Sequence, residues 1–369
     1  MYKMKQIYRL FAAAAGFALA TSLQAAIPAD SIAAQAACEN ESRVNFGLEA
    51  VTEGQWNMTG GQGAWANRLD ASLGVRLWRG AQAEAAVMAT YNAGKEMADV
   101  WQDFSNINAP NRPLRLIHFG LQQTFAADRV RVFLGVRQAD EDYFCSPQAG
   151  LFTGASYGCV PTVNDNFHIN VFPMSALGLH VEYDPVENLT LKTTIYNGNA
   201  YDTVDRIFRF RPRTDGVINL GSVTYTRPAK DDEIPATYTA GWNVGNHNRE
   251  NAGGRHTQAG FWAVAEQPVC KLGRVQTVLG ATFAKEFSAP EVAETYWNAT
   301  LSLGNLTRRG GTLAVGVSRA YYSEAHETDL ELTYSMPVGK YFSVQPALHY
   351  FSTNGKRQVL GQLRVAFSL

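Results

Sequence analysis

The stretch TDLELTYSMP, residues 328–337, decides the fold because apolar and polar side chains alternate along it without a break. This period of two is typical of a β-strand that has one apolar and one polar face. In a soluble β-sandwich the apolar face packs into the core and the polar face meets water. In a transmembrane barrel the apolar face contacts lipid, while the polar face lines a water-filled lumen. The rest of the sequence has to distinguish these two structures.

The N-terminus has the layout of an export signal. Lys3, Lys5 and Arg9 precede the apolar run 10–23, and small residues follow it. This order predicts a cleaved signal peptide over 1–25 and an N-terminal periplasmic segment over 26–42. No later apolar run reaches the length of about 18 residues that a transmembrane helix needs. The net charge of −1 argues against a nucleic-acid-binding surface.

Alternating segments of about ten residues recur along the whole chain, as in the strands of outer-membrane barrels. They predict sixteen strands, and the alternation is least regular in the eighth and the tenth. The predicted strands cover 43–52, 66–77, 82–91, 115–125, 130–138, 175–184, 189–199, 217–227, 236–245, 256–267, 274–286, 294–305, 311–321, 327–336, 341–351 and 359–369.

The connections between these strands alternate in length. An even-stranded barrel with short periplasmic turns and longer extracellular loops has this pattern, whereas a Greek-key sandwich has no reason for it. We therefore expect an all-β fold, a 16-stranded antiparallel transmembrane β-barrel over 43–369. The short set includes 79–81, 126–129, 185–188 and 337–340, and the long set includes 53–65, 92–114, 139–174 and 200–216.

The distribution of charge agrees with a barrel. When each strand is given one apolar face, charges of both signs gather on the other, and a lipid-facing Arg or Lys would cost about 2–4 kcal/mol at the membrane midplane. Aromatic residues near the strand ends suit two interfacial belts. An exported sandwich with an aromatic core is the alternative. The expected lumen-facing residues are Arg68, Asp70, Arg76, Glu84, His118, Gln122, Arg131, Arg137, His180, Glu182, Lys192, Asn298, Asp329, Glu331, Gln345, His349, Gln362 and Arg364.

The sequence contains no motif of an enzyme active site. A nucleophile elbow, a phosphate-binding Walker loop, a His-Glu-x-x-His helix and a Cys-x-x-Cys pair are all absent. His118 and His180 are more simply explained as solvated pore residues than as catalytic groups or metal ligands. We expect no enzyme activity, cofactor or metal, and an outer-membrane barrel enzyme remains a second alternative.

Several segments, in order, resemble the carbohydrate-selective porin family, the OprB-type glucose porins of Gram-negative outer membranes. They are GQWNMTGG (54–61), RLIHFGLQQTF (115–125), FPMSALGLHVEYDP (172–185), TTIYNGNA (193–200) and the closing stretch from 327 to 356. The chain departs from the family where Gly154 replaces an Asn, and where it ends on Leu369 instead of Phe. The resemblance implies an outer-membrane location, sugars as permeating solutes and, by analogy with porins of this architecture, a homotrimer. The apolar C-terminus would serve the barrel-assembly machinery.

The predicted barrel indicates passive diffusion through a water-filled lumen, and the resemblance implies that the solutes are carbohydrates, mono- and oligosaccharides. The longest connection, about 139–174, should fold inward and narrow the pore. A general, non-selective diffusion porin is the first alternative. Sugars need hydrogen-bond partners and apolar faces, so the constriction candidates are Arg137, Asp140, Glu141, Asp142 and Tyr143, followed by Trp101 and the lumen-facing Arg131, Glu331 and Arg364.

Two of these assignments have simpler alternatives. The acidic stretch 139–142 could be a solvated patch at the pore mouth, and Trp101 could be a membrane-interface anchor.

Cys145 and Cys159 lie in one loop of an exported protein, and we predict that they form a disulfide. Pairing between Cys38 and Cys270 is left open.

Overall fold

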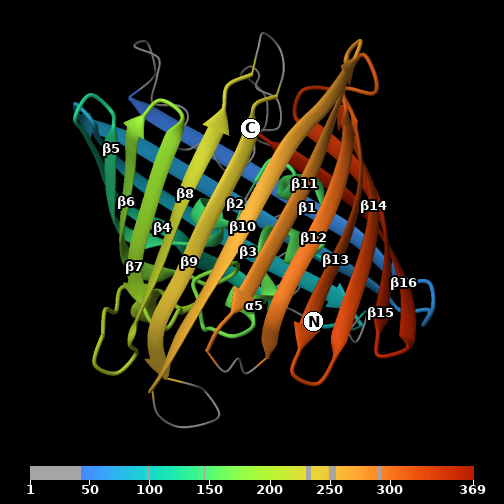
Figure 1. Cartoon of the computed structure of the whole chain (residues 1–369), viewed down its shortest axis with the longest axis horizontal. Helices are drawn as coiled ribbons and strands as arrows, with labels where there is room; N and C mark the ends of the chain where they lie inside the picture. Colours follow the sequence, from blue (N-terminus) through green and yellow to red (C-terminus); the bar gives the residue numbers. More distant parts are fainter. Residues whose placement is uncertain are drawn as a thin grey trace, which may run out of the picture.

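The computed structural model describes residues 43–95, 97, 100–144, 146–229, 234–248, 255–288 and 292–369. Its strands form one closed antiparallel barrel in chain order, in which the first strand pairs with the last (Figure 1). The predicted signal peptide (1–25) and N-terminal segment (26–42) lie outside the described residues. No helix in the described ranges is long and apolar enough to cross a membrane.

All sixteen predicted strands are present, so the predicted fold class is confirmed. Each observed strand overlaps its predicted range, and the eighth has the predicted bounds. The strands are β1 (Val44–Asn57), β2 (Gly63–Trp78), β3 (Ala81–Gly94), β4 (Arg112–Phe125), β5 (Val130–Arg137), β6 (Ala176–Val186), β7 (Leu189–Asn197), β8 (Val217–Arg227), β9 (Ala236–Asn248), β10 (Arg255–Leu272), β11 (Val275–Glu286), β12 (Ala293–Gly304), β13 (Thr312–Tyr322), β14 (His326–Val338), β15 (Phe342–Thr353) and β16 (Lys356–Ser368).

Strand β14 shows which face of the wall is the outer one. The apolar side chains of Leu330 and Leu332 are 44% and 48% exposed, whereas the alternating carboxylates of Asp329 and Glu331 are 1% and 0% exposed. In a soluble sandwich these exposures would be reversed. The apolar face therefore points outward and the charged face inward, which is the arrangement of a transmembrane barrel.

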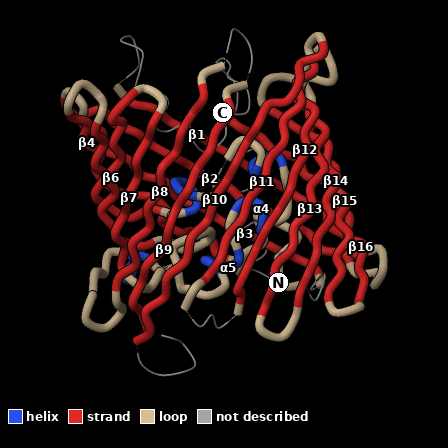
Figure 2. Tube along the Cα trace, in the orientation of Figure 1, coloured by secondary structure: helices blue, strands red, loops and turns tan. Residues whose placement is uncertain are grey.

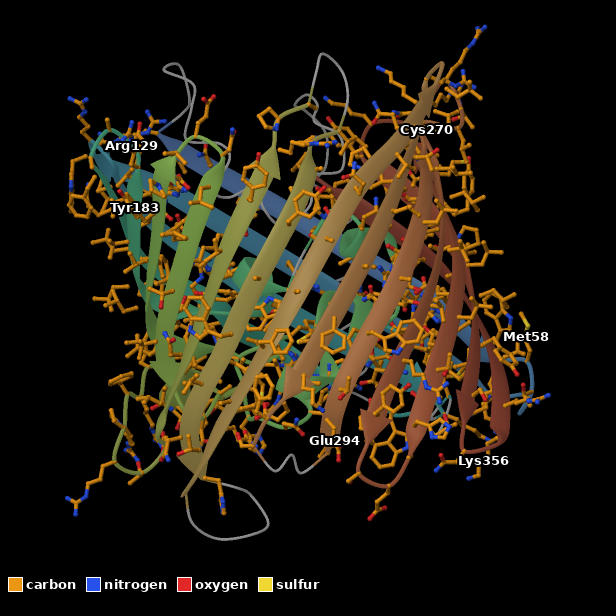
Figure 3. The ribbon with its side chains drawn as sticks, in the orientation of Figure 1. Met58, Arg129, Tyr183, Cys270, Glu294 and Lys356 are labelled. Atoms are coloured by element: carbon orange, nitrogen blue, oxygen red, sulfur yellow. The ribbon has the colours of Figure 1, made fainter. Side chains whose placement is uncertain are left out.

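The two ends of the barrel differ in their connections (Figure 3). We call the end that carries Arg129 and Cys270 the turn end, and the end that carries Met58, Glu294 and Lys356 the loop end. The turn end has the connections 79–80, 126–129, 187–188, 228–235, 273–274, 305–311 and 339–341, and the loop end has 58–62, 95–111, 138–175, 198–216, 249–254, 287–292, 323–325 and 354–355.

One predicted long loop, 53–65, is wrong. Strand β1 continues to Asn57 and β2 begins at Gly63, so a turn of five residues, 58–62, joins them. The inward residues Glu53, Gln55 and Asn57 are polar, and the outward residue between the first two is Gly54. This composition resembles a loop, although every second residue lines the barrel interior.

The loop 138–175 folds into the barrel, where Figure 2 shows its short helices inside the strand wall. Its apolar side chains, including Tyr143, Phe144 and Phe167, pack against inward residues of the wall, among them Leu220 and Trp262. The loop end of the lumen thus contains a hydrophobic core of its own. The helices are α3 (Asp140–Tyr143), η2 (Ala149–Leu151), α4 (Ala155–Gly158) and α5 (Pro161–Asn164).

A second loop, 95–111, also enters the barrel. Met97 and Phe104 are buried against Phe351 and Leu360 of the wall, and Ile107 packs against Val51. Two backbone hydrogen bonds join the inserted loops, from the Asn106 N–H to the Thr153 carbonyl at 2.8 Å and from the Ala155 N–H to the Asp103 carbonyl at 3.1 Å. The loops therefore form one insert.

Candidate functional site

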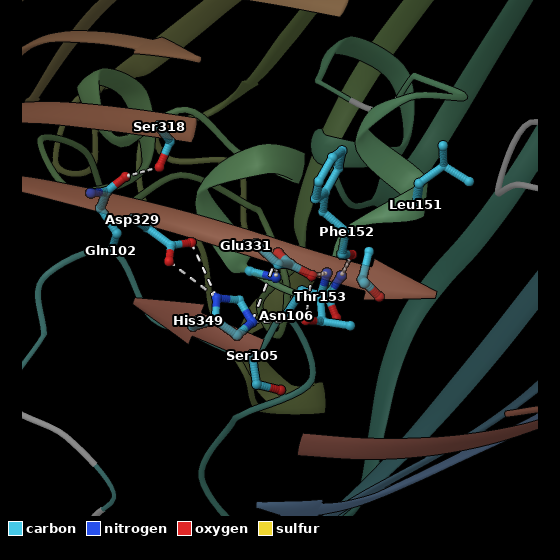
Figure 4. A network of polar contacts seen from close by, with 12 residues as sticks. Gln102, Ser105, Asn106, Leu151, Phe152, Thr153, Ser318, Asp329, Glu331 and His349 are labelled. Atoms are coloured by element: carbon cyan, nitrogen blue, oxygen red, sulfur yellow. Dashed lines mark hydrogen bonds and ion pairs between the residues drawn. The ribbon is translucent and has the colours of Figure 1, made fainter. Parts of the chain in front are cut away.

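The tip of the loop 138–175 is held by a buried carboxylate on β14 (Figure 4). Glu331 accepts hydrogen bonds from the backbone N–H and the hydroxyl of Thr153, at 2.8 and 2.7 Å, and from the N–H of Gly154 at 3.0 Å. Hydrogen bonds to a charged acceptor are stronger than neutral ones, and they satisfy loop N–H groups that the barrel has removed from bulk water. Glu331 is thus an anchor for the loop.

His349 on β15 supports this anchor. Its Nδ1 lies 3.2 Å from both carboxylate oxygens of Asp329, and its Nε2 lies 3.0 Å from the Thr153 hydroxyl. The side chains of Asp329, Glu331 and His349 could also hold a cation, since their ligand atoms lie within 4.8 Å of one another. The contacts with Thr153 and Gly154 already use both Glu331 oxygens and His349 Nε2. We therefore describe these five residues as the loop latch.

Further contacts fix the insert to strands on the same side of the barrel. Glu266 of β10 accepts the Gln148 N–H at 2.7 Å, and Gln345 of β15 donates to the Leu151 carbonyl at 2.9 Å. Glu327 of β14 accepts the backbone N–H groups of the second loop at Trp101 and Gln102. The insert is therefore bonded along the wall from β10 to β15, and its second loop also bonds to Glu53 of β1 and Arg364 of β16.

Inward charges on β1 and β2 keep part of their contact with water, although both carboxylate oxygens of Asp70 are buried. Arg68 and Asp70 of β2 form an ion pair at 2.6 Å, with side chains 27% and 13% exposed. Glu49 of β1 stands opposite Asp70 in the strand register and is exposed. The Arg68 guanidinium also lies over the Phe172 ring, 5.1 Å from its centroid. Charges of both signs and one aromatic face thus lie close together.

Two neighbouring groups extend this surface. Arg364 of β16 bonds to Glu53 through Nε at 2.6 Å and to Asn106 of the second loop at 2.5 Å, and its side chain is 12% exposed. Glu141 of α3 is 28% exposed and lies 3.9 Å from His118 on β4. We refer to Glu49, Arg68, Asp70, Glu141 and Arg364 as the open-side charges.

The structure brings only some of the predicted constriction residues together. Arg137 pairs with Asp142 at 2.5 Å, beside Glu141. The neighbouring Asp140 is buried, and this burial, followed by the charge of Glu141, raises its pKa to about 7. Tyr143 is instead buried, with its hydroxyl 2.5 Å from the Thr194 hydroxyl.

The remaining candidates lie away from the open-side charges. Arg131 pairs with Asp184 at 2.7 Å near the turn end. Trp101 is 44% exposed, and its ring contacts Tyr322. Glu331, which we expected to line the path, is fully buried in the loop latch. Cys145 lies outside the described residues, so its disulfide with Cys159 stays a prediction.

Sequence reasoning did not select Glu49, Arg68, Asp70 or Phe172 as site residues. Arg68 and Asp70 did carry a signal, because they are two charges on the inward face of one strand. The departure at Gly154 also has a structural reason. A Cβ at this position would lie 3.3 Å from Glu331 Oε2 and 3.2 Å from the Tyr157 ring, which is tight for any larger residue.

Comparisons with known proteins support a porin. The model of the carbohydrate-selective porin, OprB family, matches residues 61–369. The high-pH structure of Pseudomonas putida OprB is 17% identical, with a TM-score of 0.76, covering 88% of this chain and 94% of that chain. The low-pH structure is also 17% identical, with a TM-score of 0.62 and coverages of 88% and 92%.

More distant porins share the fold. A mutant of the Rh. blastica porin is 12% identical, with a TM-score of 0.54, covering 88% of this chain and all of that chain. No curated protein sequence matches the chain. At these identities the solved structures establish the fold alone, while the family model covers most of the chain. The resemblance found in the sequence is confirmed, and the chain belongs to the carbohydrate-selective porin, OprB family.

Proposed function

We propose that mono- and oligosaccharides diffuse passively through this barrel along the open-side charges, from the loop end, which faces outside, to the turn end, which faces the periplasm. One observation carries the proposal. The insert is bonded to the wall from β10 to β15 and, through its second loop, to Glu53 of β1 and Arg364 of β16, while the inward charges of Glu49 on β1 and Arg68 on β2 keep solvent exposure. The water-filled part of the narrowed lumen therefore runs beside Glu49 and Arg68.

The chemistry of this surface suits a sugar. Hydroxyl groups both donate and accept hydrogen bonds; the partly exposed Arg68 guanidinium offers donors, and the exposed carboxylate of Glu49, opposite Asp70 in the strand register, offers acceptors. The C–H face of a pyranose ring is apolar, and Phe172 supplies an apolar surface next to Arg68. Hydrogen-bond acceptors, hydrogen-bond donors and an aromatic ring lie close together here, and this combination favours carbohydrates over solutes that carry only charge.

The alternatives differ in what they require of this surface. A general diffusion porin would conduct small solutes by size and charge, with no preference for sugars. The family and the fold indicate a channel rather than an enzyme. We retain the homotrimer, the cleaved signal peptide, ion conduction and recognition by the barrel-assembly machinery as proposals that native mass measurement, N-terminal sequencing, conductance and assembly assays would each test.

Block of ion current by glucose in planar bilayers tests the proposed path. Glucose should lower the single-channel current of the wild type in a saturable way. In the Arg68→Gln variant, half-block should need about tenfold more glucose, because a hydrogen bond to a charged group contributes about 1.5–3 kcal/mol. Arg308→Gln removes the same charge from an exposed turn and is the matched control. Equal block in all three proteins would rule out a sugar path past Arg68.

A further inference from the structure

The loop 198–216, at the loop end, reaches the outer surface of the barrel through residues 202–208, while Ala200 and Tyr201 bond to the inserted loop. Its helix α6 (Val204–Ile207) is followed by Phe208, whose ring packs edge-on against Phe119 with the centroids 5.9 Å apart. Phe119 belongs to the outward face of β4 and is 50% exposed. Arg112, at the start of the same strand, pairs with Asp202 at 2.8 Å. The loop therefore extends the lipid-facing wall.

This loop combines basic and apolar side chains within a short stretch. The segment 204–213 reads VDRIFRFRPR, in which arginines alternate with phenylalanines. Val204, Phe208 and Phe210 are 52%, 43% and 47% exposed. Exposed apolar residues so close to several guanidinium groups are typical of a surface that meets both an anion and a lipid. We call Arg112, Arg206, Arg209, Arg211 and Arg213 the basic patch.

The acidic residues of the loop neutralise part of this charge, since Asp202 pairs with Arg112 at 2.8 Å. Asp215 is buried and accepts hydrogen bonds from Asn197 and Tyr201 at 3.0 and 2.9 Å. Asp205 lies 3.7 Å from Arg206 and 3.6 Å from Arg209, and exposed pairs at such distances contribute little. The patch thus presents a net positive surface beside apolar rings.

We propose that the basic patch binds the phosphorylated headgroup of a glycolipid in the outer leaflet, with the acyl chains lying along Phe119 and Phe208. The guanidinium fork matches phosphate oxygens in a bidentate manner. The continuity of the patch with the lipid-facing wall distinguishes a lipid from a soluble anion, because only a lipid offers phosphate and acyl chains together. The inference does not depend on which solute the channel conducts.

Native mass spectrometry of the detergent-solubilised barrel with bisphosphorylated lipid A tests this site. The Arg211→Gln, Arg213→Gln double variant should bind lipid A about 25-fold more weakly, since each arginine near an anionic lipid surface contributes about 1 kcal/mol, or about fivefold. The Arg308→Gln, Arg309→Gln variant is the matched control, because it removes two exposed arginines from the turn end. It should bind lipid A like the wild type. Dephosphorylated lipid A should bind weakly to all three proteins.

Several results would overturn the proposal. They are equal lipid A binding by the double variant and the wild type, an equal loss in the control, and equal binding of dephosphorylated lipid A. If the wild type formed a dimer without lipid and the double variant did not, the patch would instead be a contact surface for a second copy of the chain. If the double variant failed to fold, the salt dependence of lipid A binding by the wild type would test the proposal. Its affinity for lipid A should fall steeply with added salt, and a salt-independent affinity would contradict a phosphate site.

Discussion

Replacing Glu331 by Gln should free the inserted loop without unfolding the barrel. The carboxylate accepts three hydrogen bonds from the loop, two from Thr153 and one from Gly154, with lengths of 2.7 to 3.0 Å. A Gln side chain has the same shape but keeps only one acceptor oxygen, and its NH₂ group would face a loop N–H. The wall survives because the backbone ladders of β14 to β13 and β15 do not involve this side chain.

The magnitude follows from the hydrogen bonds. A bond to a charged acceptor contributes about 1.5–3 kcal/mol, and a buried N–H left without a partner costs a similar amount. We expect loop docking to weaken by about 3 kcal/mol, which corresponds to about a 150-fold change in the ratio of docked to undocked loop. The undocked state should then become visible in the current through a single channel.

Single-channel recording in planar bilayers measures this change. The Glu331→Gln channel should show a larger and noisier conductance, and a trisaccharide should enter liposomes more easily relative to glucose. Asp184→Asn is the control, because Asp184 bonds to Arg131 and Thr190 on the wall and not to the insert. Unchanged conductance, noise and sugar ratio in Glu331→Gln would refute the loop latch.

Three further predictions concern the outer face, the pH response and the cysteine pair. Leu332→Arg, on the outer face, should lower the free energy of folding into bilayers by about 2–4 kcal/mol, whereas inward Gln122→Arg should fold, as heat-modifiable gel migration would show. Burial, followed by the charge of Glu141, raises the pKa of Asp140 from 3.8 to about 7. The contribution of Asp140 to loop docking is therefore fully present below pH 3.8 and is lost as the pH rises through about 7. Channel noise should therefore grow over this range in the wild type, and an identical rise in Asp140→Asn would contradict it. Peptide mapping without reduction should find Cys145 linked to Cys159, and a free thiol at either position would reject the link.

The strands could be predicted because lipid outside and water inside impose a period of two on nearly every one of them. The pattern is weakest in β8 and β10, and the structure gives the reason. Leu220 and Trp262 point inward but are apolar, since the inserted loop covers them in place of water. The sequence of a strand reports what touches each face and not which loop supplies the contact. The segment 53–57 was predicted as part of a loop because its inward residues are polar, although they line the barrel interior.

The candidate site was predicted less completely, because it depends on contacts between distant parts of the chain. Glu331 was correctly placed on the inward face, but its partner Thr153 is 178 positions away, and no local pattern indicates that a loop will cover it. Arg68, with its partner Asp70, forms part of the site because the insert leaves its side chain partly exposed beside Phe172. Deciding which inward charges stay wet requires the path of that insert.

Liposome swelling with glucose and with a neutral amino acid of matched size tests the central claim most directly. Both solutes fit an open pore equally well, so any difference in rate reports chemical recognition along the path rather than size. The account predicts faster swelling with glucose, and it predicts that Arg68→Gln brings the two rates closer together. Equal rates in the wild type would contradict sugar selectivity and identify the barrel as a general diffusion pore.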